Sequence, residues 1–414
     1  MSVCESQRNV SSFASKQEKE IATESLLPWA DSAFRANPYP WYEVVRRDAP
    51  VYPDPLQENS YVVSRYEDVL KFGKHPSVSS VVPDWVPKGP WSMFKASMIV
   101  KDGSEHVALR RRSNKWFTPK LAAQYAEKTA AAVGEVLDDL GPSGIVEAYR
   151  NIALLPAHYA MCAALGLPND GYDSASAWMH DAMVGLGTAV TPEEEERCKT
   201  AFVYLNDRVN HYLQLRRKDP SPGMVSSWID DVANGEMTER ELFEGVLLFW
   251  ATGTPNAAYL ICGGLETFAR QPEIFDLWKS DPSQHQPILN ELARLYNPEI
   301  SFTRFTTEEL EIRGVKIPAG KLVRFMIASA NRDPEVFSNP DKFDLSRTVD
   351  SAGNLTFGTG PHQCPGMIIS KAEVVAVFNV IASRVKRIEL AGSPVYAHSD
   401  RAAAYLRLPL RMIT

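Results

Sequence analysis

The chain has 414 residues, of which 44% are hydrophobic and 23% are charged, and its formal net charge is −7. This composition is typical of a globular protein, and the negative balance argues against nucleic acid as a partner. The five cysteines are scattered without a Cys-x-x-Cys or a paired framework, which favours a reducing compartment and a cytoplasmic location.

Residues 1–25 are polar and mixed in charge, without the apolar core of a signal peptide or membrane anchor, so we expect a flexible segment there. No linker or internal repeat divides residues 26–414, which are predicted to form a single domain. The run Gly245–Leu265 is uncharged and of transmembrane length. A glycine, a proline and an asparagine in its middle favour a helix buried in a globular core.

The first part of the chain mixes helices with a strand. An amphipathic helix is predicted over Pro38–Asp48, and a strand at Tyr61–Ser64 leads to a helix over Tyr66–Phe72. From Ser77 to Ser97, prolines and large aromatic residues predict an irregular segment.

Helical periodicity dominates the middle of the chain. The predicted helices cover 104–115, 119–140, 143–166, 172–187, 192–217, 223–233, 238–270 and 272–280. From Leu310 to Phe325 the pattern changes to strands, with Pro318-Ala319-Gly320 as the turn of a hairpin.

The segment Phe357–Gly366 reads FGTGPHQCPG, and its glycines allow the backbone to wrap tightly beneath a flat macrocycle. Met367–Val375 is predicted to be a helix, so Cys364 lies at a helix N-terminus, where free amides and the macrodipole favour a thiolate. A thiolate on haem iron favours O–O cleavage. The segment therefore predicts a haem-thiolate site with Cys364 as the metal ligand. The other four cysteines are interpreted as small buried hydrophobic residues.

These ten residues resemble the cysteine-ligand loop of the cytochrome P450 family, Phe-Gly-x-Gly-x-His-x-Cys-x-Gly, at every fixed position. The resemblance extends from about residue 38 to the C-terminus. It implies a mainly α fold with small β-sheets and a soluble, bacterial-type haem-thiolate monooxygenase. The implied cofactor is haem b (iron protoporphyrin IX).

The resemblance also assigns a structural network. Glu291 and Arg294 lie three residues apart on one helical face, where they can pair. They match the family's Glu-x-x-Arg helix, and Arg347 falls where the family completes a buried Glu-Arg-Arg network. A bidentate Arg–carboxylate pair suits this role, which lysine would not fill well.

His106 and Arg110 lie four residues apart on a predicted helix, so both side chains can reach the same place. They resemble the family's pair that binds the haem propionates, which need cationic or donor partners once partly buried. The residues expected to bind the cofactor are His106, Arg110, Arg304, Phe357, Gly358, His362, Cys364 and Gly366.

The sequence of the helix expected across the haem differs from the family's usual motif, which reads (Ala/Gly)-Gly-x-(Asp/Glu)-Thr. When the chain is aligned on the threonine, Thr254 is kept as the catalytic hydroxyl that assists O–O cleavage, and Gly253 replaces the acid. Pro255 has no N–H and leaves the Ala251 carbonyl without its helical partner. Asn256 is a candidate polar relay.

The resemblance places a substrate pocket among largely apolar side chains, which favours a compact hydrophobic or aromatic substrate. The predicted pocket residues are Trp85, Trp91, Phe94, Trp178, Met179, Met183, Phe249, Thr252, Ile300, Phe302 and Arg401. The predicted reaction is hydroxylation or oxidative O-demethylation with O2.

Because no reductase module is recognisable in the chain, electrons are expected from a ferredoxin or flavodoxin and its NAD(P)H reductase. The cluster of Arg111, Arg112 and Lys115 is the predicted docking site. Three alternatives stay open: a P450 that uses peroxide, one that catalyses coupling or rearrangement, and a haem sensor without catalysis. A cysteine-dependent hydrolase has only His362 as a candidate partner for Cys364.

Overall fold

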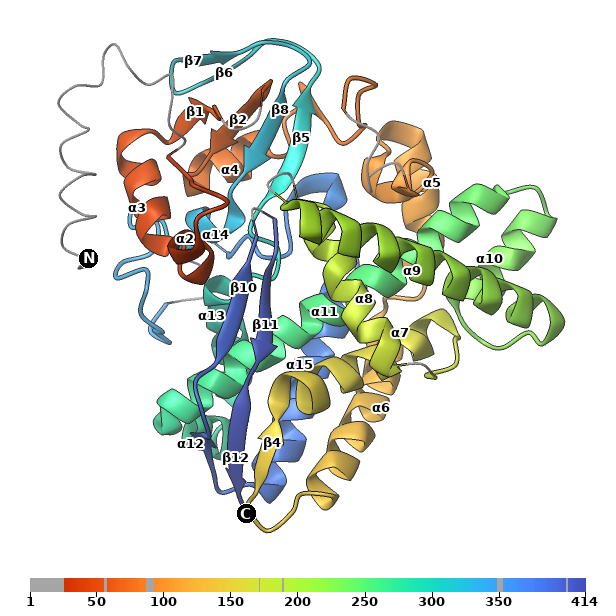
Figure 1. The fold of residues 1–414 in the computed structure, drawn as a ribbon, viewed down its shortest axis with the longest axis vertical. Coiled ribbons are helices and arrows are strands. Elements are labelled where there is room, and N and C mark those ends of the chain that lie inside the picture. Colours follow the sequence, from red (N-terminus) through yellow and green to blue (C-terminus); the bar gives the residue numbers. More distant parts are fainter. Residues whose placement is uncertain are drawn as a thin grey trace.

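The computed structural model describes residues 26–55, 58–86, 93–170, 172–187, 190–347, 353–399 and 401–414. The segment 1–25, which was expected to be flexible, lies outside the described residues, as does Trp91. Helices dominate the structure, and small sheets pack against them (Figure 1). This confirms the predicted mainly α class with small β-sheets.

The helices follow the predicted periodicity closely in the middle of the chain. The α-helices are α2 (Ser32–Ala36), α3 (Tyr39–Asp48), α4 (Tyr66–Phe72), α5 (Gly103–Asn114), α6 (Pro119–Asp138), α7 (Leu155–Leu165), α8 (Tyr172–Gly185), α9 (Pro192–Lys218), α10 (Met224–Ala233), α11 (Glu239–Arg270), α12 (Pro272–Ser280), α13 (His285–Leu295), α14 (Ile327–Ala330) and α15 (Met367–Arg384). Within the part of the chain that the structure describes, no helix is both long and apolar enough to cross a membrane.

Among the residues that the structure describes, the strands form four small sheets. The strands are β1 (Val51–Pro53), β2 (Ser60–Val63), β3 (Val78–Ser79), β4 (Ile145–Glu147), β5 (Phe302–Thr306), β6 (Leu310–Ile312), β7 (Val315–Ile317), β8 (Leu322–Phe325), β9 (Arg387–Leu390), β10 (Val395–His398), β11 (Ala403–Arg407) and β12 (Pro409–Ile413). The largest sheet has the order β1-β2-β8-β5-β3, and only β2 and β8 run parallel in it. The other sheets are β4-β12-β9, β10-β11 and β6-β7.

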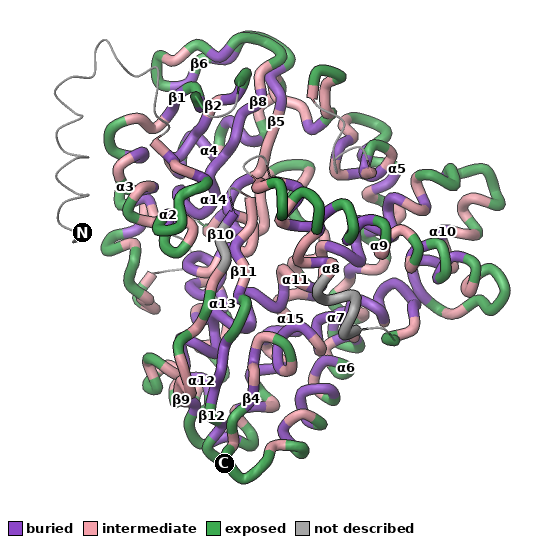
Figure 2. Tube along the Cα trace, in the orientation of Figure 1, coloured by how far each residue is buried: buried purple, intermediate pink, exposed green. Residues whose placement is uncertain are grey.

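The helix α11 runs through the middle of the helical part of the molecule (Figure 1). It starts with a capping box between Thr238 and Glu241 and contains Pro255 without interruption. Most side chains of α11 are buried, whereas α9 and α10 carry many exposed residues at the surface (Figure 2). The apolar run Gly245–Leu265 is therefore the interior of a core helix, as predicted.

Two local predictions were wrong because pairing between distant segments decided the outcome. The helix predicted over 143–166 begins instead with β4, which pairs antiparallel with the C-terminal strand β12. A π-helical turn at Tyr149–Leu154 follows, and α7 starts only at Leu155. Contacts across more than 250 residues thus override the local helical pattern.

The second wrong prediction is the hairpin turn at Pro318-Ala319-Gly320. The hairpin is formed by β6 and β7, and its turn is Arg313-Gly314, where both residues have positive φ. The segment 318–320 instead leads from β7 to β8, which pairs with β2 and β5 in the large sheet.

Candidate active site

The cysteine loop is held in place by its own backbone. The Cys364 amide donates to the Phe357 carbonyl over 2.8 Å, and Gly358 and Gly360 both have φ near +70° (73° and 72°). A Cβ on Gly360 would lie 2.7 Å from the Cβ of Lys74, so no larger residue fits there. The loop ends at Gly366, the N-cap of α15.

Cys364 is surrounded by protein, and its exposed surface borders a cavity of about 340 Å3. Burial raises the pKa of the thiol, while the backbone amides of Gly366 and Met367 and the charge of Arg110 act in the opposite direction. A coordinated iron would add a positive charge that favours the thiolate further. The donor set is therefore suited to a metal-bound sulfur at the start of α15.

The cavity is bounded by segments that lie far apart in the sequence. Its walls include parts of α5, of α11, of the segment 298–305, which contains most of β5, and of the cysteine loop. Phe357, Gly358, Cys364 and Gly366, which were predicted to contact the cofactor, all line this cavity. Most of the remaining wall is aliphatic or aromatic, which suits a flat macrocycle and an apolar ligand.

The predicted propionate-binding residues meet in this cavity. His106, Arg110, Arg304 and His362 all line it, and the rings of His106 and His362 lie 4.1 Å apart between centroids. The Nε2 atom of His106 is buried and has no hydrogen-bond partner among the described residues. A buried polar atom of this kind calls for a polar ligand group, so the cavity fits a haem with its carboxylates at this end.

Burial sets the charge state of these donors. It lowers the pKa of His362 to about 4 and that of Arg304 to about 10. His362 Nε2 is paired with Asp102 Oδ1 at 2.9 Å, and Arg110 donates to the Gln363 carbonyl over 2.5 Å. Arg110 and Arg304 thus supply the positive charge, while the two imidazoles contribute hydrogen bonds.

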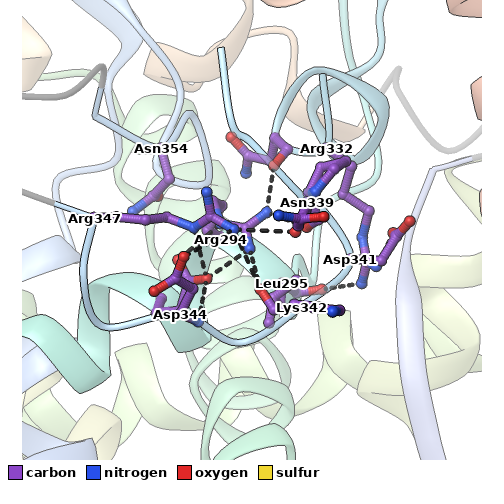
Figure 3. Close-up of polar contacts among 12 residues, drawn as sticks. Arg294, Leu295, Arg332, Asn339, Asp341, Lys342, Asp344, Arg347 and Asn354 are labelled. Carbon is purple, nitrogen blue, oxygen red and sulfur yellow. Dashed lines mark hydrogen bonds and ion pairs between the residues drawn. The ribbon is translucent and has the colours of Figure 1, made fainter. Parts of the chain in front are cut away.

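The Glu291 network is shown in Figure 3. Arg294 donates to both carboxylate oxygens of Glu291, over 2.8 and 2.6 Å, and Arg347 Nε donates to the same carboxylate over 3.1 Å. The Glu291 and Arg294 side chains are only 6% and 2% exposed. The backbone amide of Asp344 also donates to Glu291, over 3.0 Å. The structure therefore brings together the three residues of the predicted network.

The structure does not bring Thr254 to the cavity. On α11 the cavity-lining residues include Phe249, Thr252, Gly253 and Asn256. Because successive helical residues are about 100° apart, Thr254 points roughly opposite to this stripe. Its hydroxyl is buried and has no hydrogen-bond partner among the described residues.

Only some of the residues predicted to form the substrate pocket line the cavity. Phe249, Thr252, Phe302 and Arg401 line the cavity, whereas the remaining described members do not. Trp85 is 44% exposed and packs against Phe305, and Phe94 packs against Phe202 in the core.

The other members lie in the core or beside a second cavity. Trp178 contacts Tyr204, and Met179 and Ile300 are buried. Met183 lines a second cavity of about 270 Å3.

Several cavity residues were not predicted from the sequence. Glu299 and Arg324 line the cavity, as does Glu373 on α15, whose pKa is raised well above its ordinary value by burial. Asp102, which orients His362, was also missed. The sequence offered one local signal, because Glu299 directly precedes the predicted pocket segment at Ile300.

The chain is similar to known proteins in sequence and in fold. A model of the family described as "Cytochrome P450" matches residues 286–384. The 6-deoxyerythronolide B hydroxylase of Saccharopolyspora erythraea is 26% identical over 399 residues, covering 92% of this chain and 97% of that enzyme. The vitamin D(3) 25-hydroxylase of Pseudonocardia autotrophica is 27% identical, covering 92% and 94%.

The solved structure of epothilone B-bound cytochrome P450epoK is similar, with a TM-score of 0.85 at 24% identity, covering 94% of this chain and 99% of that one. At this identity the likeness concerns the fold.

Proposed function

The chain belongs to the cytochrome P450 family and is an oxidoreductase of the monooxygenase type, and we propose that it inserts one oxygen atom into a compact, largely apolar organic substrate. The proposed reaction is hydroxylation or oxidative O-demethylation, with haem b as cofactor and electrons from separate proteins. The observation that carries this proposal is the Cys364 thiol at the floor of an apolar cavity that also holds His106, Arg110 and Arg304.

In the proposed reaction, residues of the cavity would bind the cofactor and the substrate. Haem ligated by Cys364 would supply the oxygen-activating iron, since a thiolate ligand favours O–O cleavage. Arg110 and Arg304 would hold the cofactor carboxylates. Phe249 and Phe302 would present apolar surface to the substrate and exclude water from it.

The test is the absorbance spectrum of the dithionite-reduced protein under carbon monoxide. We expect a band near 450 nm in the wild type, and its complete loss in Cys364→Ser, because an alcohol oxygen does not replace the thiolate as a ligand. A wild-type band near 420 nm in freshly prepared protein would contradict thiolate ligation.

The proposed electron donor is an acidic ferredoxin or flavodoxin, together with its NAD(P)H reductase. Arg111 and Lys115 are exposed and follow Arg110, which contacts the loop of Cys364 through the Gln363 carbonyl. Arg112 is held by Asp231 and Glu236, so it contributes less positive charge than was predicted.

The docking proposal is tested with the double variant R111E/K115E. We expect slower reduction by the protein donor, most strongly at low salt, and unchanged reduction by dithionite. Equal losses with both reductants would contradict the docking site. The control is Arg47→Glu, which reverses an exposed arginine on α3, outside the proposed docking site, and should leave the association rate nearly unchanged.

Use of hydrogen peroxide in place of O2 is the second candidate function. It is favoured by one observation, namely that the cavity-facing residues of α11 include no carboxyl group. Turnover with hydrogen peroxide is compared with turnover on NAD(P)H and redox partners. Faster peroxide-driven turnover would favour this second function over the first.

A further inference from the structure

Asn256 is the polar side chain of α11 that is best placed to act in the cavity. Thr252 also lines the cavity, but its hydroxyl already donates to the Leu248 carbonyl over 2.8 Å. The Asn256 amide makes a single long contact, from Nδ2 to Glu299 Oε1 at 3.5 Å. It therefore keeps hydrogen-bonding capacity for another group in the cavity.

Glu299 brings a carboxyl group to the cavity, to which α11 contributes none. It lies just before β5 and forms an isolated bridge with Ala402, which fixes its backbone beside Arg401. Its second oxygen lies 3.5 Å from Arg401 Nη2. Both contacts are longer than ordinary hydrogen bonds, so a water molecule can join this carboxyl to Asn256.

Asn256 also lines the second cavity of about 270 Å3. The wall of that cavity is mainly apolar, but it also contains polar side chains, namely His180, Tyr396 and the ion pair of Arg35 with Glu194 at 2.8 Å. Polar groups of this kind can bind ordered water. Asn256 thus borders both the cavity of Cys364 and a second cavity with polar groups in its wall.

From this geometry we propose that Asn256 and Glu299 form a proton relay into the cavity of Cys364, in the role that the family resemblance gave to Thr254. The inference rests on the proposed monooxygenase function. In the overall reaction O2 takes up two electrons from the redox partner and two protons, so that one oxygen atom enters the substrate and the other leaves as water. The Glu299 carboxyl would deliver these protons one at a time through water held by the Asn256 amide, and would regain each one from solvent. The amide orients the water and does not itself change protonation.

The first test uses carbon monoxide as a probe of polar groups near the bound ligand. The C–O stretching band is compared in wild type, Asn256→Ala and Thr254→Val, each checked for its 450 nm band. We expect Asn256→Ala to shift the C–O band and Thr254→Val to leave it in place, because Thr254 lies on the opposite face of α11. A shift in Thr254→Val alone would overturn the assignment.

The second test separates proton transfer from a structural role of Glu299. NAD(P)H-driven oxygen consumption is measured with a surrogate ferredoxin and its reductase. Glu299→Gln keeps the shape and one acceptor oxygen but cannot release a proton, and should lose about tenfold or more in rate. Glu299→Asp should retain most of the rate.

A matched control is Glu244→Gln, which alters a buried carboxyl of α11 that does not line the cavity. It should behave as wild type. Oxygen consumption by Glu299→Gln at the wild-type rate, or equal losses in Gln and Asp variants, would overturn the relay. Failure of the proposed function itself would appear separately, as a wild-type protein without a 450 nm band.

Discussion

The two sides of the cavity are held together in different ways. On the cysteine side, Glu291 makes bonds of 2.6 to 3.1 Å to Arg294 and Arg347, and the loop of Cys364 is closed by its own backbone. On the α11 side, Asn256 and Glu299 meet only at 3.5 Å. On the cysteine side, the polar groups of Glu291 and its two arginines already have hydrogen-bond partners. On the α11 side, Asn256 and Glu299 can still form hydrogen bonds with another group.

This difference follows from what each side has to do. A metal ligand must keep one geometry, so the residues around it have all their hydrogen bonds formed and contribute to the stability of the folded protein. A side that admits a ligand and water must leave donors and acceptors available to them. Substitutions on the cysteine side should therefore cost stability, and those on the α11 side should change chemistry first.

The largest effect on stability is expected from Arg294→Ala. The variant leaves the buried Glu291 carboxylate without its bidentate partner, which costs about 3–5 kcal/mol in free energy of unfolding. The matched control is Arg47→Ala, which removes an exposed bidentate pair with Asp48 and should cost less than about 1 kcal/mol. Urea unfolding of both variants checks this, and equal costs would contradict the contrast between the two sites.

A pH-dependent change in stability is expected where α7 packs against α11. There His158 contacts Trp250 and the Cys162 thiol. Burial lowers the pKa of His158 to about 4, below its ordinary 6.5. The unfolded chain therefore binds the proton more readily, and stability falls as the pH drops from 6.5 towards 4, by up to about 3 kcal/mol.

The variant His158→Gln should lose this part of the pH dependence. Urea unfolding at pH 7.5, 6 and 5 gives the comparison. An identical pH dependence in the variant and the wild type would show that His158 titrates normally.

The smallest effect is expected from Thr254→Val. A buried hydroxyl without a partner costs free energy, so its replacement by a methyl group of similar shape should leave stability unchanged or raise it by about 1 kcal/mol. Thermal unfolding measures this. A clear loss of stability would mean that the hydroxyl has a partner, for example an ordered water.

A feature could be predicted from the local sequence wherever the residues that form it lie close together in one segment. The boundaries of α4 match the prediction, and α9 starts at residue 192 as predicted, with Thr191 as its N-cap. The family could be named from the ten residues Phe357–Gly366, because their glycines, histidine and cysteine are required together in one loop. The pairing of Glu291 with Arg294 could likewise be predicted from their spacing on one helix.

The α11 side could not be predicted in the same way. Alignment on a threonine selected Thr254, but the helix turns this residue into the core and presents Thr252 and Asn256 to the cavity. Only the packing of α11 fixes which face points inward. Glu299 reaches Asn256 across 43 positions of sequence, and no local pattern records that contact.

The sequence by itself indicated the cysteine loop, the family and most of the helices, because each depends on residues close together in the chain. Tertiary structure alone decided that β4 pairs with β12, which face of α11 borders the cavity, and which carboxyl group stands beside it. These outcomes depend on contacts between distant segments, whose free energies outweigh local preferences only once the chain is packed.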